Sequence, residues 1–154
     1  MANITLARLL KLKNRYVSRL AETGSIVRLY NSRIVGEHPV NVRGSFEAHK
    51  LTLERLVNIK QLLEDANQGE QRGRILRISE LKTMLGWLKE LDVKSGKDTS
   101  GYLEREYVAE IKLEERQEIT RTIEEEIFQT QEEIDSYNAT TKVPLPEGYE
   151  ILPE

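Results

Sequence analysis

Apolar residues recur at helical spacing along the first part of the chain. Their steps of four and three residues are typical of one long helix with a coiled-coil-like seam. Asn3 is the expected N-cap, and Gly36 with Pro39 predicts the end of the helix. Gly24 predicts either a close approach of a neighbouring backbone or a kink. The predicted seam consists of Leu6, Leu10, Lys13, Val17, Leu20, Gly24, Val27, Asn31 and Ile34.

A second amphipathic helix is predicted from an N-cap at Ser45 to about Ala66 and Asn67. Additional apolar residues beside its main stripe make the apolar side wide, which indicates contact with two neighbours. The expected buried side holds Phe46, His49, Leu53, Leu56, Ile59 and Leu63, and it is widened by Leu51, Val57 and Leu62.

The next part of the chain leaves two alternatives open. Residues 74–78 fit a short strand or the beginning of a third helix, for which Ser79 is a candidate cap. Residues 105–112 alternate between apolar and polar, which fits a strand or the first turns of the last helix. If both segments are strands, they form a small hairpin. A polar loop is expected over residues 93–101.

A last helix is predicted around a stripe that ends at Asn138, a residue that favours a helix C-terminus. Residues 1–143 are expected to form a single helical domain, and residues 144–154 an extended tail that contains proline. The predicted fold is mainly α, an antiparallel long-helix bundle with coiled-coil-like packing and one small two-stranded β appendage. The stripe of the last helix consists of Ile119, Ile123, Ile127, Thr130, Ile134 and Tyr137.

Charge is sorted by position along the chain. Residues 1–43 hold eight Lys or Arg against two acids, a net charge of +6. Residues 104–154 hold five Lys or Arg against fifteen acids, a net charge of −10. Opposite fields favour one docking arrangement over others. We therefore expect the Glu-rich face of residues 114–135 to meet the Arg/Lys face of residues 8–28, within one chain or across subunits.

The sequence contains no pattern that identifies a reaction. It has no cysteine, and His38 and His49 are isolated from each other and from any Glu-x-x-His pair. The acids at residues 124–126 fit a solvated helix face better than a metal site. We therefore expect no enzyme activity, no cofactor and no metal. No segment has the roughly 20 apolar residues that cross a bilayer, and no export signal is present, so a cytoplasmic location is expected.

The function predicted from these patterns is that of a non-enzymatic structural or interaction protein. Several helices have apolar stripes on more than one side, and a single antiparallel layer cannot cover them. We therefore predict a homo-oligomer, with a dimer as the most common closed form. The residues expected at helix–helix or oligomer interfaces are Leu10, Val17, Leu20, Val27, Ile119, Ile123, Ile127 and Ile134.

The alternative is a nucleic-acid-binding protein that uses its basic first helix. It is less favoured, because the strongly acidic last part of the chain repels a polyanion. The residues that would contact phosphates are Arg8, Lys11, Arg15, Arg19 and Arg28.

Three segments carry a resemblance to a known family. They are the opening at residues 7–13, the helix end at 62–67 followed by residues 79–82, and the segment at 133–141. With these segments, residues 4–143 resemble the septicolysin-like family of small helical bacterial and phage proteins, whose function is largely uncharacterised. The resemblance implies a helical-bundle fold and no catalytic residue.

Overall fold

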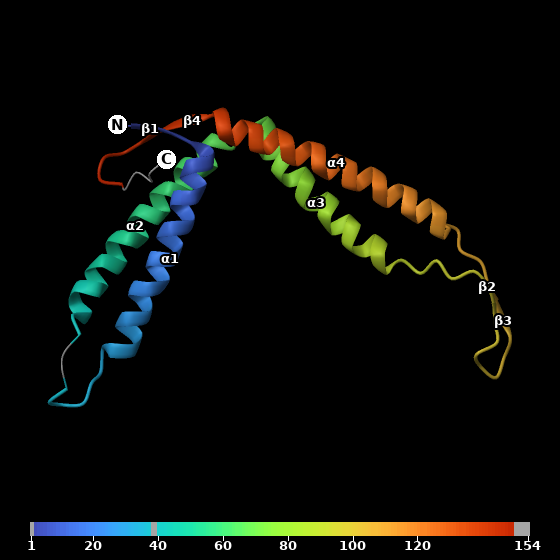
Figure 1. Ribbon diagram of the computed structural model, residues 1–154, viewed down its shortest axis with the longest axis horizontal. Coiled ribbons are helices and arrows are strands. Elements are labelled where there is room, and N and C mark those ends of the chain that lie inside the picture. The colour runs from blue at the N-terminus through green and yellow to red at the C-terminus, as the bar shows by residue number, and fades with distance from the viewer. Residues whose placement is uncertain (1, 38–39, 150–154) are drawn as a thin grey trace. The chain divides into compact units, whose positions relative to one another are not determined.

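The chain forms four helices and four short strands within the described residues, 2–37 and 40–149, of the computed structural model (Figure 1). Helices that pack against each other predominate, which confirms the predicted mainly α fold class, and two small two-stranded antiparallel sheets are present where one was predicted. In chain order the elements are β1 (Ala2–Thr5), α1 (Leu6–Tyr30), α2 (Val42–Ala66), α3 (Glu70–Glu90), β2 (Gly96–Asp98), β3 (Arg105–Tyr107), α4 (Leu113–Thr140) and β4 (Lys142–Leu145).

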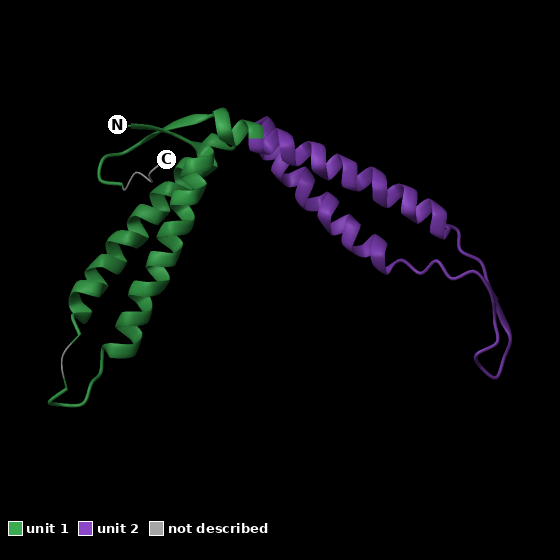
Figure 2. Ribbon diagram, viewed as in Figure 1, with its two compact units in different colours: residues 1–68, 136–154 green, residues 69–135 purple. Residues whose placement is uncertain are grey.

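The chain divides into two compact units (Figure 2). Unit 1 contains residues 1–68 and 136–154, and unit 2 contains residues 69–135. Helix α4 is continuous across the boundary, so its C-terminal end belongs to unit 1. That residues 1–143 fold as a single domain stays a prediction.

Unit 1 is built on the antiparallel pair α1 and α2. Helix α1 begins after Thr5, whose hydroxyl accepts a hydrogen bond from the backbone N–H of Arg8 at 3.3 Å. The two helices bury a shared row of large apolar side chains, and removing these from water is the main stabilising term. The row, which we call the seam, consists of Leu6, Leu9, Leu12 and Tyr16 of α1 and Leu56, Ile59 and Leu63 of α2.

The predicted seam of α1 was wrong by one residue. The structure buries Leu9 and Tyr16, whereas the predicted Val17 is 45% exposed. Both sets recur with the same period, so periodicity alone does not distinguish two stripes about 100° apart on one helix. The helix is also shorter than predicted, since it ends at Tyr30. Its N-cap is Thr5 rather than Asn3, and the predicted stop at Pro39 lies outside the described residues.

The predicted buried side of α2 was partly wrong for the same reason. Leu56, Ile59 and Leu63 are buried as predicted, but Phe46 and Leu53 are each 47% exposed. The helix ends at Ala66 as predicted. It begins at Val42 rather than near Ser45, because the Asn41 side chain accepts a hydrogen bond from Gly44 N–H at 3.0 Å and caps the first turn.

A polar contact fixes the register of α1 against α2. His49 Nδ1 lies 2.9 Å from the Thr23 hydroxyl oxygen, so His49 is a satisfied structural side chain. A Cβ atom on Gly24 would lie 3.1 Å from His49 Cε1. The glycine therefore leaves room for a side chain, that of His49, rather than for the neighbouring backbone that was predicted.

Strands β1 and β4 lie at one end of the helical hairpin that α1 and α2 form in unit 1. They pair antiparallel, with Ile4 opposite Val143 and Ala2 opposite Leu145. Ile4, Val143 and Leu145 join the buried cluster of the seam. The tail predicted from residue 144 is thus extended over residues 144–145, but the chain's own N-terminal strand holds it. Residues 150–154 of that tail lie outside the described residues.

Unit 2 is built on α3 and α4. Leu81 and Leu88 of α3 pack against Ile123 of α4, and partly buried apolar side chains surround them. Residues 74–78 belong to α3, and Ser79 lies inside that helix rather than at its cap. The strand at Arg105–Tyr107 instead pairs with β2, at Gly96–Asp98, so the predicted hairpin partner was wrong. Gly96 has a φ of 98°, which suits the tight loop there.

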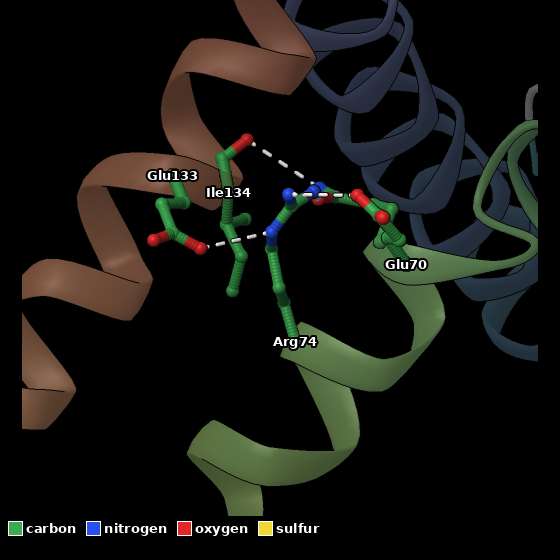
Figure 3. A network of polar contacts seen from close by, with 5 residues as sticks. Glu70, Arg74, Glu133 and Ile134 are labelled. Atoms are coloured by element: carbon green, nitrogen blue, oxygen red, sulfur yellow. Dashed lines mark hydrogen bonds and ion pairs between the residues drawn. The ribbon is translucent and has the colours of Figure 1, made fainter.

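Polar contacts tie the beginning of α3 to the end of α4 (Figure 3). Arg74 Nε donates to a Glu133 carboxylate oxygen at 3.0 Å, and its Nη2 lies 3.3 Å from Glu70. The buried Gln71 amide donates to the Ile134 carbonyl at 3.4 Å. Farther along, Arg77 contacts Glu126 at 2.8 Å. Residue numbers rise along α3 from Arg74 to Arg77 while those of their partners on α4 fall from Glu133 to Glu126. Helices α3 and α4 are therefore antiparallel.

We predict that the seam carries the stability of unit 1. Ile59 is fully buried, so Ile59→Ala leaves a cavity and should lower the free energy of unfolding by about 2–5 kcal/mol. Leu29 is 66% exposed, and Leu29→Ala should change it by no more than about 0.5 kcal/mol. Urea unfolding followed by circular dichroism measures both values. Equal losses for the two variants would contradict the assignment of the seam.

Candidate interaction surfaces

The predicted interface residues of α4 face the partner helix within unit 2. Ile123 and Ile134 are buried, and Ile119 and Ile127 are partly buried against the cluster that holds Leu81 and Leu88. All four isoleucines thus lie at the helix pair of their own unit, and they are not available to a second molecule without unfolding it.

The predicted interface residues of α1 lie beside the seam rather than in it. Leu10 and Leu20 are half-buried and pack against the edge of the core, and Val27 is also half-buried. Val17 is exposed. In helix α1, Leu10 follows the buried Leu9 by one position, and Val17 follows Tyr16 by one.

Helix α2 presents the same relation to the seam. Leu53 and Val57 each follow a buried residue, Thr52 and Leu56, by one position. One position is a rotation of about 100° around a helix. Because two antiparallel helices are related by a two-fold axis across the pair, residues one position after the seam on both helices lie on the same side. We call this side the stripe flank, and its four exposed apolar residues the hairpin stripe: Val17, Phe46, Leu53 and Val57.

The hairpin stripe extends along the pair, with Lys50 between Phe46 and Leu53. The contact between Thr23 and His49 places Leu20 level with Leu53, and Val27 level with Phe46. At that end the stripe opens into a groove of about 580 Å³ between the end of α1 and the beginning of α2. The groove, which we call the tip groove, is lined by apolar residues and two arginines, among them Val27, Tyr30, Val40, Phe46, Arg33 and Arg43.

On the opposite flank the chain's own C-terminal segment contacts the helix pair through Tyr149. Arg55 and Asn58 precede the buried Leu56 and Ile59 by one position, so they lie on the other side of the seam. The Tyr149 hydroxyl accepts a hydrogen bond from the Asn58 amide at 3.1 Å, and the Arg55 guanidinium lies 5.6 Å from the Tyr149 ring centre. We call this side the strap flank. One flank of the hairpin thus has a partner segment, and the other exposes the hairpin stripe.

The cations proposed for nucleic-acid binding are divided between the two flanks. Arg8 and Arg15 precede the buried Leu9 and Tyr16, which places them on the strap flank together with Lys11 and Arg19. Arg19 lies 5.6 Å from the ring centre of Tyr16. Arg28 follows Val17 by three helical turns and lies on the stripe flank. Four of the five cations therefore share the strap flank, and Arg28 lies on the other flank.

The acids of α4 have basic partners within unit 2. Arg74 pairs with Glu133, and Arg77 pairs with Glu126. These arginines were missed from the sequence because the residues around 74–78 were weighed as a strand. Docking of the Glu-rich face of residues 114–135 on residues 8–28 stays a prediction.

A cluster of Lys94, Asp98 and Ser100 in unit 2 combines groups that occur in catalytic sites. Ser100 donates to Asp98 through its backbone N–H at 2.9 Å and through its hydroxyl at 2.6 Å. Lys94 also donates to Asp98, and this hydrogen bond raises the pKa of Lys94. A lysine with a raised pKa is a poor general base, and the serine proton points to a carboxylate that holds it in a turn. The cluster is therefore a structural turn.

Within residues 2–37 and 40–149 no group of His, Asp and Glu side chains is arranged to hold a metal ion. Among the same residues no helix is long and apolar enough to cross a bilayer.

Comparison of the chain with models of known protein families, with curated proteins and with solved structures found no match. The septicolysin-like resemblance and the cytoplasmic location therefore stay predictions from the sequence.

We predict that Asp98 stays ionised at unusually low pH. The hydrogen bonds from Lys94 and Ser100 hold its pKa well below the ordinary value of 3.8. Because the folded-state pKa is lowered, the carboxylate stabilises its loop fully above about pH 3.8, and this contribution is lost as the pH falls further. An NMR titration of the Asp98 side-chain carbon should show a midpoint below 3.8, and Lys94→Gln should move it upward. A wild-type midpoint at the ordinary value, unmoved by Lys94→Gln, would contradict the hydrogen-bonded turn.

Proposed function

We propose that the protein is a non-enzymatic structural or interaction protein that works as a helical homo-oligomer. The observation that carries the proposal is the hairpin stripe. It places Val17, Phe46, Leu53 and Val57 on one exposed side of a helix pair whose other flank contacts Tyr149 of the chain's own C-terminal segment. Exposed apolar side chains gathered on one side are typical of a protein-binding surface.

The size of the hairpin stripe suits a reversible association. Full burial of a Val, Leu or Phe side chain is worth about 1.5–3 kcal/mol, and these residues are about half-buried already. Each therefore offers about 1 kcal/mol when a partner covers it. Association also costs several kcal/mol of translational and rotational freedom, so the four residues of the stripe alone fall short of the roughly 8 kcal/mol that micromolar binding requires, and a partner must also bury surface beside the stripe.

Self-association is favoured over a soluble small-molecule ligand because of the shape of the surface. The hairpin stripe follows two helices over about three turns, from Val17 toward Val27 on α1 and from Phe46 to Val57 on α2. Such a row matches a face of another helix whose residues recur at intervals of three and four. A second copy of the chain supplies helices with such faces at equal concentration.

We predict that polar substitutions in the hairpin stripe abolish the oligomer. Leu53→Gln combined with Val57→Gln removes two apolar side chains from the stripe while it keeps residues that favour a helix. The double variant should sediment as a monomer at tens of micromolar, where the wild type sediments as an oligomer. Because both residues are about half exposed, its free energy of unfolding in dilute solution should change little.

The matched control is Leu29→Gln with Leu76→Gln, which makes the same chemical change at two other exposed leucines. This control should associate like the wild type. An unchanged oligomer in the Leu53→Gln/Val57→Gln variant would show that the assembly uses another surface.

A further inference from the structure

The side of α4 that faces away from α3 carries a second exposed row of residues. Its net charge is opposite in sign to that of the exposed row on α2. Its residues follow each other at steps of four and three, the spacing of a helix face that meets another helix. With four glutamates and one arginine, its net charge is −3. We call it the acidic stripe, and its members, all exposed, are Glu114, Glu118, Arg121, Glu125, Phe128 and Glu132.

The exposed row on α2 that holds the α2 residues of the hairpin stripe has the same spacing, and we call it the hairpin row. From Phe46 it proceeds through Lys50, Leu53, Val57 and Lys60, again in steps of four and three. All five residues are exposed, and the two charged ones are both basic. The chain therefore presents two exposed helix rows of equal period and opposite charge, one in each unit.

We propose that the acidic stripe of a second copy of this chain docks on the hairpin stripe, with Phe128 of that copy in the tip groove. The inference rests on the proposed function and names the two surfaces that meet. It commits to contact between unlike surfaces, in which unit 1 of one molecule receives unit 2 of the next.

The aromatic residue of the acidic stripe fits the tip groove in both shape and charge. Phe128 is 64% exposed, and beside it lies a shallow hollow of about 300 Å³ that Glu124 and Glu125 also line. It is thus an exposed apolar side chain beside two acids, with Arg121 and Gln129 lining the same hollow. The tip groove is apolar at Val27 and Phe46 and basic at Arg33 and Arg43, and its volume of about 580 Å³ accommodates an aromatic ring. An aromatic anchor in a pocket with a charged rim is the usual centre of a protein interface.

Charge then selects the direction of the docked helix. With Phe128 level with Phe46, an antiparallel α4 places Glu125 beside Lys50 and Glu114 beside Lys60. The intervals agree because both rows advance by four and three residues. A parallel α4 leaves Lys60 beyond the acidic stripe, since the row after Phe128 continues only to Glu132 before unit 2 ends near Asp135.

Pairing of the hairpin stripe with itself is less favourable. An antiparallel self-pairing that matches Leu53 with Val57 of the other copy also sets Lys50 against Lys60. Like charges that face each other across an interface repel, and this repulsion disfavours the wrong partner. Against the acidic stripe the same two lysines meet glutamates.

The test reverses charge on one surface at a time. Lys50→Glu with Lys60→Glu makes the hairpin row acidic, and Glu114→Lys with Glu125→Lys makes the acidic stripe basic. Each double variant alone should bind itself at least tenfold more weakly than the wild type, by sedimentation velocity at low salt. An equimolar mixture of the two variants should recover association, because every hairpin row then meets a stripe of opposite charge.

Charge-matched controls separate this contact from a general effect of net charge. Lys11→Glu with Lys82→Glu, and Glu80→Lys with Glu115→Lys, make equal changes at exposed positions outside both rows. These controls should keep the wild-type dissociation constant. Phe128→Ala should weaken association at least tenfold, whereas Val108→Ala, at an apolar residue that is 82% exposed, should not.

The outcomes distinguish this inference from the proposed function. If the wild type associates and Leu53→Gln/Val57→Gln abolishes the oligomer, but the charge-reversed pair does not recover association in the mixture, then the proposed function stands and the acidic stripe is not the partner. A wild type that stays monomeric overturns both. Recovery in the mixture, together with the loss in Phe128→Ala, supports the inference.

Discussion

A pair of helices has a single seam, and this constraint governs the surface of unit 1. The seam of α1 and α2 buries Leu9, Tyr16 and Ile59, but apolar residues one position farther around each helix cannot enter it. Only a further layer of protein can remove these apolar residues from water. On one flank the C-terminal segment supplies a cover, through Tyr149 and its contact with Asn58. On the other flank the apolar row is exposed, and the functional account rests on that asymmetry.

The sequence predicted where the helices lie along the chain better than it predicted which side of each helix is buried. The end of α2 and the stripe of α4 were predicted correctly, because strong periodicity and breaker residues mark them. The seam of α1 was missed by one position, because Leu9 and Leu10 are both apolar and have apolar neighbours at helical spacing. Which of the two rows is buried depends on the partner helix, and that information lies far along the chain.

The candidate site could be predicted only in part, for the same physical reason. Val17 was named as an interface residue from its spacing, and the structure exposes it beside Leu53 and Val57 on one flank. The tip groove was not foreseen, since it forms only when the end of α1 and the beginning of α2 come together. The segregation of charge along the sequence did indicate complementary surfaces, although Arg74 and Arg77 already take two of the acids of α4.

The central claim is that this chain associates with itself through its exposed helix faces, and native mass tests it most directly. Size exclusion coupled to light scattering at tens of micromolar should give a mass above that of the 17.8 kDa chain, falling toward it on dilution. The account also predicts a lower mass at high salt, because charge orients the contact. A sharp mass of 17.8 kDa at every concentration and salt would contradict it.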